Sequence, residues 1–174
     1  MVNRFDCLGE EKVDQLSITD EIQAANAMDT DELLKLENQI CFPLYAASRL
    51  VTQCYQPVLD KLGLTYPQYL VMLVLWENDN VPVKTLSEKL FLQSNTLTPL
   101  LKRMQEAGLV GRTRSEKDER SVLVSLTAEG KALKAEAPQV AQQFGEHMGI
   151  SMEEAVALHE LLYKLIGNIS GELV

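Results

Sequence analysis

Cys41 is the residue of this sequence whose surroundings best suit chemistry. It stands in the stretch ENQICFPLYAASR, two residues before Pro43, and apolar residues follow it at helical spacing. Proline is tolerated in the first turn of a helix, so the sequence predicts a helix that begins beside Cys41. The unpaired N–H groups at a helix start stabilise a thiolate, the nucleophilic form of cysteine. Tyr45 lies one turn further along the same face, where its hydroxyl can line the same pocket.

A free cysteine is more often a buried apolar residue, and this remains the alternative interpretation of Cys41. The chain has three cysteines, a number that fits a reducing compartment better than a disulfide scaffold. Cys54 cannot bridge to Cys41 within one helix, because thirteen residues span about 20 Å and a disulfide needs Cα atoms within about 7 Å. Cys7, in the acid-rich first segment, is the alternative thiol that could form a disulfide with an oxidised Cys41.

The sequence lacks the patterns of most catalytic sites. It has no C-x-x-C pair, no cluster of metal-ligating residues and no glycine-rich phosphate loop, and His147 and His159 each stand alone. We therefore expect no metal, no cofactor and no enzymatic activity. A thiol peroxidase is the enzyme alternative, but its usual Thr and Arg helpers are not recognisable around Cys41.

Length and composition fit one globular domain with an appendage. The 174 residues are 46% hydrophobic and 24% charged, which is ordinary for such domains. No apolar run approaches the roughly 20 residues that cross a bilayer, and the N-terminus has no signal-peptide core. We expect a cytoplasmic protein with no membrane contact. Residues 1–30 read as an acidic, flexible tail, and residues 31–174 as the folded domain.

The net charge of −9 hides a basic segment. Residues 84–120 carry eight basic and five acidic residues, a net charge of +3, whereas residues 1–40 carry three basic and ten acidic residues, a net charge of −7. For a polyanionic partner, the placement of charge matters more than its sum. The basic segment alone is also compatible with an ordinary solvated surface.

The order of predicted elements gives the fold class. Thr65 and Gln68 form a capping box before an apolar helix that we expect to be central and buried. A short helix over Val83–Leu90 precedes a second helix, capped by Ser94 or Asn95 and ending at Ala107. Two alternating strands follow, over 109–115 and 120–127. A helix-turn-helix followed by a β-hairpin predicts a mainly α protein with a small β-hairpin wing, a winged helix over 65–126.

Helices on either side of the winged helix, over 31–62 and 127–172, have apolar faces that one chain leaves uncovered. They suggest dimerisation helices and a homodimer. Pro57 is expected to kink or restart the first of them. Short polar groups at the start of the second helix of the helix-turn-helix suit base edges and phosphates in a major groove, with two basic residues further along for phosphates. These candidates are Gln93, Ser94, Asn95, Thr96, Thr98, Lys102 and Arg103.

The stretches LENQICFPLYAASR, LDKLGLTYPQYLVMLVLWE, LTPLLKRMQEAGLV and RTRSEKDERSVLVSLTAEG resemble the MarR family of winged-helix transcription regulators. Within it, the first two stretches resemble the organic-hydroperoxide-resistance regulators, and the resemblance covers about residues 34–170. The acidic tail departs from the family pattern. The resemblance implies that Arg120 enters a minor groove and that Asp118 braces it through a carboxylate–guanidinium pair. Arg112, Arg114 and Lys117 would contact the DNA backbone.

The same resemblance implies a redox sensor centred on Cys41. It adds Tyr55 and Tyr66 to Tyr45, with the hydroxyls of Tyr55 and Tyr66 reaching the sulfur from the other subunit. An organic hydroperoxide would be the oxidant, and release from a pseudo-palindromic double-stranded operator the result. Two-cysteine members of the group resolve with a C-terminal cysteine, which this chain lacks, so a small cellular thiol would form a mixed disulfide with Cys41. The alternative within the family is a repressor released by phenolic or drug-like ligands, with Cys41 structural.

Overall fold

The computed structural model describes residues 30–116, 118, 120–140, 142 and 149–172. The predicted tail therefore lies outside the described residues except for its last member, and so do Cys7 and His147. The chain divides into two compact units between Ser48 and Arg49. Each unit is described by itself.

The first unit begins with short helical pieces. Helix α2 covers Thr30–Leu33, the 3-10 helix η1 covers Leu36–Asn38, and helix α3 covers Cys41–Leu59 and continues into the second unit. The sequence predicted helical structure from residue 31 onward, and the structure interrupts it twice before α3. Side-chain amides explain one break, because Asn38 Nδ2 donates to the Glu32 carbonyl at 2.8 Å and so competes with a continuing helix.

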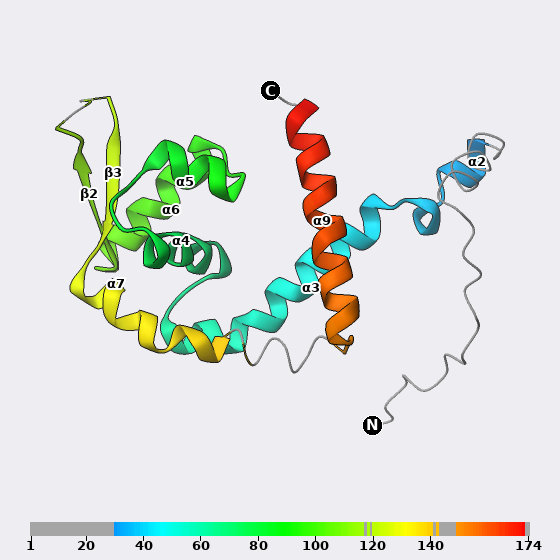
Figure 1. Ribbon diagram of the computed structural model, residues 1–174, viewed down its shortest axis with the longest axis horizontal. Coiled ribbons are helices and arrows are strands. Elements are labelled where there is room, and N and C mark those ends of the chain that lie inside the picture. Colours follow the sequence, from blue (N-terminus) through cyan, green and yellow to red (C-terminus); the bar gives the residue numbers. More distant parts are fainter. Residues whose placement is uncertain (1–29, 117, 119, 141, 143–148, 173–174) are drawn as a thin grey trace. The chain divides into compact units, whose positions relative to one another are not determined.

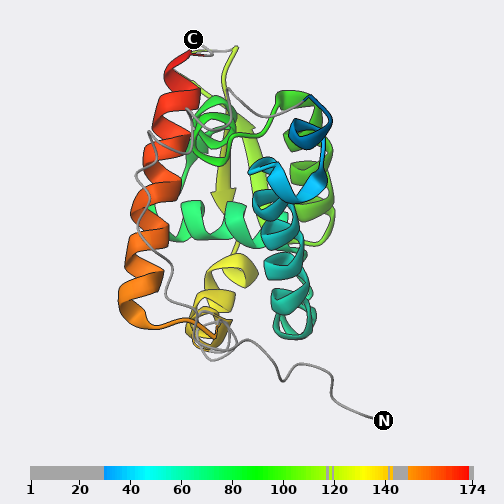
Figure 2. The same cartoon turned by 90° about the vertical axis from the view of Figure 1, so that its right-hand side faces the viewer.

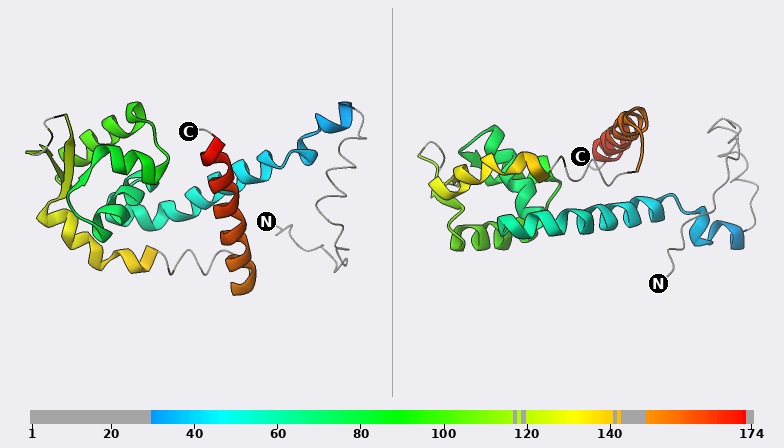
Figure 3. Two further views of the ribbon diagram at one scale, coloured as in Figure 1. Left: turned by 45° about the horizontal axis from the view of Figure 1, so that its top comes forward. Right: turned by 90° about the horizontal axis from the view of Figure 1, so that it is seen from below.

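Helix α3 continues through Pro57 to Leu59, as one helix in Figure 3. The expected restart at Pro57 is wrong, because the element that follows, the 3-10 helix η2 over Asp60–Leu62, begins only after Leu59. Gly63 then takes a left-handed backbone with φ 64° and turns the chain toward the next helix.

Helix α4, over Tyr66–Glu77, is the centre of the second unit. The capping box predicted at its start is present, and Gln68 Oε1 accepts from the Thr65 backbone N–H at 2.8 Å. Tyr69, Val71, Met72, Leu75 and Trp76 of this helix are buried, as its apolar sequence predicted.

Helices α5 (Val83–Leu90) and α6 (Ser94–Glu106) form the predicted helix-turn-helix. Both lie beside α4 and next to the sheet (Figure 1). The N-cap of α6 is Gln93, not Ser94 or Asn95, and its side chain makes no capping hydrogen bond. Gly108 follows the C-cap with φ 74°, as expected for the end of a helix.

The predicted hairpin is present and has a third strand beside it. Strands β2 (Val110–Arg114) and β3 (Val122–Leu126) pair antiparallel, and the two-residue β1 (Val81–Pro82) pairs with β3 on its other side. The strand order is β1-β3-β2. Val124 lies opposite Val81 on one side and Arg112 on the other, and its side chain is fully buried.

Helix α7 (Ala128–Ala132) follows directly on β3 (Figure 2) and continues into the 3-10 helix η3 (Leu133–Ala135). Thr127 caps α7, because its hydroxyl oxygen accepts from the Gly130 N–H at 3.0 Å. Helix α9 covers Met152–Glu172 and begins with a second capping box: Ser151 N–H donates to the Glu154 carboxylate, and Glu154 N–H donates to Ser151 Oγ. None of the described helices is long and apolar enough to cross a membrane.

The end of α4 is joined to the base of the hairpin and to α7. Asp79 Oδ1 accepts from the backbone N–H of Leu126 at 2.8 Å, and its Oδ2 lies 3.1 Å from Lys131 Nζ. Trp76 Nε1 donates to the Gly130 carbonyl at 2.9 Å. Burial acts to raise the pKa of Asp79, but the Leu126 N–H, the Lys131 ammonium and the Asn80 N–H outweigh it, so this pKa lies below its ordinary value.

Candidate functional site

Helix α6 presents one buried and one exposed face. Leu97, Leu100, Leu101 and Met104 recur at helical spacing and are buried in the core. The predicted polar candidates are all exposed on the remaining surface: Gln93, Ser94, Asn95, Thr96, Thr98, Lys102 and Arg103. The apolar spacing of this helix therefore determines which of its side chains remain available to a partner.

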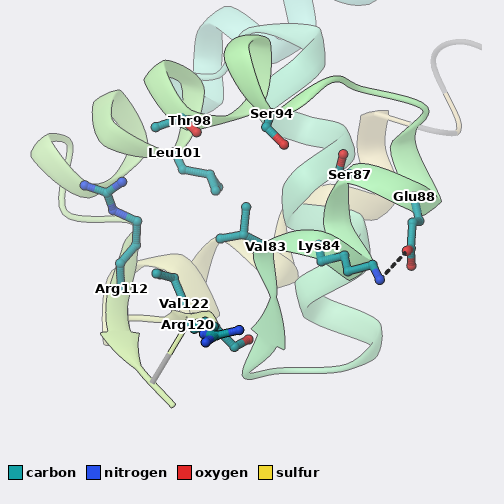
Figure 4. A pocket seen from close by; sticks show the side chains of 11 residues that line it. Val83, Lys84, Ser87, Glu88, Ser94, Thr98, Leu101, Arg112, Arg120 and Val122 are labelled. Atoms are coloured by element: carbon teal, nitrogen blue, oxygen red, sulfur yellow. Dashed lines mark ion pairs between the residues drawn. The ribbon is translucent and has the colours of Figure 1, made fainter. Parts of the chain in front are cut away.

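A hollow of about 520 Å³ lies between α5, α6 and the hairpin. Ser94 and Thr98 line it from α6, Arg112 and Arg120 from the hairpin, and Lys84 from α5 (Figure 4). One acidic residue, Glu88, also lines the hollow, and its carboxylate lies 3.8 Å from Lys84 Nζ. Ser87 and Ser121 line it as well, and three cationic side chains with four hydroxyls around one hollow suit an anionic partner.

Arg112 is held in place by the helix it faces. Its Nε donates to Gln105 Oε1 of α6 at 2.7 Å, which links the hairpin to the exposed side of that helix. The guanidinium group keeps further N–H donors directed away from this bond. Gln105 was not among the residues singled out from the sequence, because seven positions separate it from its partner and the pairing depends on the fold.

The tip of the hairpin differs from the expected arrangement. The Asp118 carboxylate accepts from the backbone N–H of Arg120 at 3.1 Å, and among the described ion pairs there is none between Asp118 and the Arg120 guanidinium. In this structure Asp118 thus shapes the turn, and Arg120 directs its side chain to the hollow. An Asp side chain that bonds the backbone two residues on is a common turn device.

The structure gathers some of the predicted residues and separates others. Ser94, Thr98, Arg112 and Arg120 meet at the hollow, whereas Arg114 lines a second hollow on the hairpin with Asn80 and Glu116. Lys102 lies 3.8 Å from Glu106 in an exposed ion pair. Lys117 lies outside the described residues. Lys84 and Ser87 of α5 were missed, because an amphipathic helix does not reveal which exposed residues another element will approach.

Cys41 is the first residue of α3, and it is exposed. Pro43 is the third residue of the helix, so the predicted helix start beside the thiol is confirmed. Phe42 and Tyr45 are 41% and 60% exposed, so the first turn of α3 presents apolar and aromatic side chains to solvent around the sulfur. The alternative interpretation of Cys41 as a buried apolar residue does not fit its exposed position in this unit.

Tyr55 and Tyr66 lie together in the second unit. Their ring centroids are 5.0 Å apart, and Tyr69, which the sequence did not single out, lies 6.2 Å from Tyr55. Tyr69 in turn contacts Trp76 edge-on at 6.2 Å. The sequence signal for Tyr69 was its i, i+3 spacing from Tyr66 on α4, which places both rings on the same face of the helix.

Burial raises the pKa of Tyr55 to about 12, and the neighbouring Tyr66 and Tyr69 add to the rise. Burial also raises the pKa values of Tyr66 and Tyr69. All three phenols therefore remain protonated well above neutral pH, and each keeps an O–H that can donate a hydrogen bond to an anion.

Replacing Tyr55 by Phe is expected to remove the highest step of the alkaline tyrosine titration. The folded-state pKa of about 12 lies above the unfolded value near 10, so the stability that neutral Tyr55 contributes is complete below pH 10 and is lost as the pH rises toward 12. Phenolate absorbance of the five tyrosines measures the step, and thermal unfolding measures its effect on stability. A Tyr55→Phe protein that keeps the highest step and the same alkaline loss of stability would contradict this assignment.

The known proteins that this chain resembles are transcriptional regulators. The family model for the transcriptional regulator SarA/Rot matches residues 53–137. The chain is 52% identical over 139 residues to the organic hydroperoxide resistance transcriptional regulator of Bacillus subtilis strain 168, covering 78% of this chain and 92% of that protein.

Two solved structures of AbfR, a protein of Staphylococcus epidermidis, share the fold. Reduced AbfR bound to DNA matches with a TM-score of 0.70 and 32% identity, over 84% of this chain and all of that one. Overoxidized AbfR bound to DNA matches with a TM-score of 0.64 and 35% identity, over 80% and 98% of the two chains.

Proposed function

Since this chain belongs to the MarR family of winged-helix transcription regulators, in its organic-hydroperoxide-resistance group, we propose that it is a repressor whose hold on DNA is switched by oxidation of Cys41. Its relatives are transcription regulators, not enzymes. The observation that carries the proposal is the exposed thiol at the first residue of α3 in a chain so similar to a hydroperoxide-resistance regulator.

The DNA partner is proposed to be a pseudo-palindromic operator bound by a homodimer. Each subunit would insert the start of α6 in a major groove and Arg120 in the adjacent minor groove, whose negative potential favours arginine. The half-site centres would lie about 10 base pairs apart. The basic hollow beside α6 supports this proposal, because phosphates are the anions that such a surface would meet first.

The oxidation step transfers one oxygen atom. The Cys41 thiolate attacks the terminal oxygen of an organic hydroperoxide, so that an S–O bond forms while the O–O bond breaks. The sulfur is oxidised to a sulfenic acid, and the peroxide is reduced to an alkoxide that takes a proton from water and leaves as an alcohol. The unpaired N–H groups at the start of α3 favour the thiolate that begins the reaction.

Tyrosine hydroxyls are proposed to hold that thiolate. Tyr45 would contribute from the same chain, and Tyr55 and Tyr66 from the other subunit of the dimer. Two observations support this role for Tyr55 and Tyr66: their rings lie side by side, and both phenols remain protonated hydrogen-bond donors at neutral pH. An oxidised sulfur would need different hydrogen bonds and more space. The two winged helices would then move, and the half-site spacing would be lost.

The released form is proposed to be a mixed disulfide. A small cellular thiol attacks the sulfenic sulfur, a sulfur–sulfur bond forms, and water leaves. One comparison favours a mixed disulfide over further oxidation of the sulfur as the form that leaves DNA. AbfR in its overoxidized state has been crystallised bound to DNA, so overoxidation does not prevent that protein from binding DNA. Cys54, exposed on α3, is not assigned a part in resolution.

Exchange of the thiol for a hydroxyl tests the proposal. Cys41→Ser is expected to bind the operator like the reduced wild type and to stay bound when an organic hydroperoxide and a small thiol are added. The wild type should lose about 10- to 100-fold in affinity under the same conditions. Fluorescence anisotropy with a labelled operator duplex measures both, with hydrogen peroxide run in parallel to compare oxidants. Cys54→Ser is the matched control and should respond like the wild type.

Two results would count against the proposal. If Cys41→Ser still releases the operator with the hydroperoxide, the sensor is elsewhere. If neither protein responds to oxidant but a phenolic ligand releases both, the regulator belongs to the ligand-released type and Cys41 is structural.

A further inference from the structure

Phe91, in the turn between α5 and α6, has a backbone conformation that bulky residues rarely adopt. Its φ of 52° and ψ of 35° are left-handed, where the Cβ of an L-residue crowds the carbonyl that follows. At Gly63 and Gly108, the chain uses glycine for the same purpose. Among the described residues, the other non-glycine with positive φ is Asn80, a residue type that tolerates it.

The turn is fixed from within α5. The Leu92 N–H donates to the Ser87 carbonyl at 3.1 Å, and Ser87 Oγ donates to the Leu92 carbonyl. Leu92 is half-buried against the core, whereas Phe91 is 67% exposed. The Phe91 ring thus adds little to the core of the chain, although its backbone is strained. Strain of this kind concentrates at functional positions.

Phe91 adjoins the proposed DNA surface. It precedes Ser94 by three residues, and both Ser94 and Ser87 line the basic hollow. Among the described residues between Leu73 and Ile150, Phe91 is the one exposed large apolar residue. The leucines on either side of it are half-buried, and the exposed residues that follow Leu92 are polar, so this segment has no broad apolar patch of the kind that a protein partner needs.

We propose that Phe91 packs against the apolar surface of the operator beside the start of α6, on a deoxyribose or a thymine methyl group. Phenylalanine is a suitable residue for such a contact. This inference rests on the DNA binding proposed above. The strained turn would hold the ring outward before DNA arrives, so that no ordering is needed on binding.

Phe91→Gly separates this role from a structural one. Glycine suits the left-handed backbone, so the thermal midpoint should stay the same or rise. Loss of the ring should weaken binding about tenfold. The dependence of affinity on salt should keep its slope, because no phosphate contact is lost. The probe is the duplex that the reduced, full-length wild type selects from a random library.

Matched variants complete the experiment. Asn80→Gly makes the same backbone exchange outside the helix-turn-helix and should bind like the wild type. Phe91→Asn, which also tolerates a left-handed backbone, should weaken binding as glycine does, and Phe91→Tyr should retain it. Deoxyuridine in place of single thymines distinguishes the two contacts: loss of affinity in the wild type but not in Phe91→Gly identifies a thymine methyl, and no loss in either identifies a deoxyribose.

The inference is overturned if Phe91→Gly binds as tightly as the wild type, if its salt slope becomes shallower, or if affinity falls only together with stability. A wild type that selects no duplex at all would instead refute the proposed function, so the two failures are distinguishable.

Discussion

Gly130→Ala is expected to destabilise the second unit by about 4 kcal/mol or more, which is among the largest effects of a single substitution. A Cβ at Gly130 would lie 2.2 Å from the Leu109 carbonyl oxygen, and this oxygen belongs to the backbone. The helix cannot move away easily, because the Gly130 N–H donates to Thr127 Oγ1 and its carbonyl accepts from Trp76 Nε1. Relief of the clash would therefore break the cap of α7 or the bond to the core tryptophan.

Urea unfolding followed by tryptophan fluorescence measures this effect, since Trp76 is the one tryptophan of the chain and is itself bonded to Gly130. Gly111→Ala is the control. A Cβ there would meet Ser125 Oγ at 3.5 Å, an ordinary contact, so its stability should change by less than about 1 kcal/mol. Equal effects of the two substitutions would mean that α7 does not approach Leu109 as closely as the structure places it.

Arg120→Ala is expected to lower operator affinity by about 10- to 100-fold, the range for loss of a specific arginine contact. Arg120 lines the hollow beside Ser94 and Thr98, and its backbone is fixed by the bond to Asp118. Arg120→Lys should recover only part of the loss, because lysine has the charge but not the planar group. The salt dependence should fall by about one counterion in the alanine variant and remain unchanged in the lysine variant.

Affinity titrations at several salt concentrations, with the same duplex, measure these effects. Lys61→Ala removes an exposed positive charge in η2, outside the hollow, and is the matched control for net charge. A loss as large for Lys61→Ala as for Arg120→Ala would show that the overall charge, not the placement of Arg120, governs binding.

The elements with strong local signals could be predicted from the sequence. The capping boxes at Thr65 and Ser151 and the glycine after Ala107 mark the helix ends that the structure has. The polar residues predicted for the accessible side of α6 are all exposed, because its leucines recur at helical spacing and are buried. In these segments, the residues that decide the structure lie within one or two helical turns of one another.

Features that depend on distant residues could not be predicted in this way. Strand β1 has only two residues, one of them proline, and it exists because β3 passes beside it. The bond between Asp79 and Leu126 joins residues 47 positions apart. In the candidate site, Gln105 and Lys84 become relevant only when the hairpin folds back on α5 and α6. No local pattern encodes such approaches, because they follow from the packing of the whole unit.

Because Asp79 holds the Leu126 end of β3 and Trp76 holds α7 directly after it, the wing is oriented at its root and not at its tip. Under the DNA binding proposed above, substitutions in the loop at the tip should therefore change which DNA sequences are preferred without changing the angle between the hairpin and the rest of the unit. A substitution of Asp79 would have the opposite effect: the residues at the tip would be unchanged, but the orientation of the hairpin that carries them would change. In relatives that keep this anchor, a change of operator sequence should thus be accompanied by substitutions at the tip of the hairpin and not at its root.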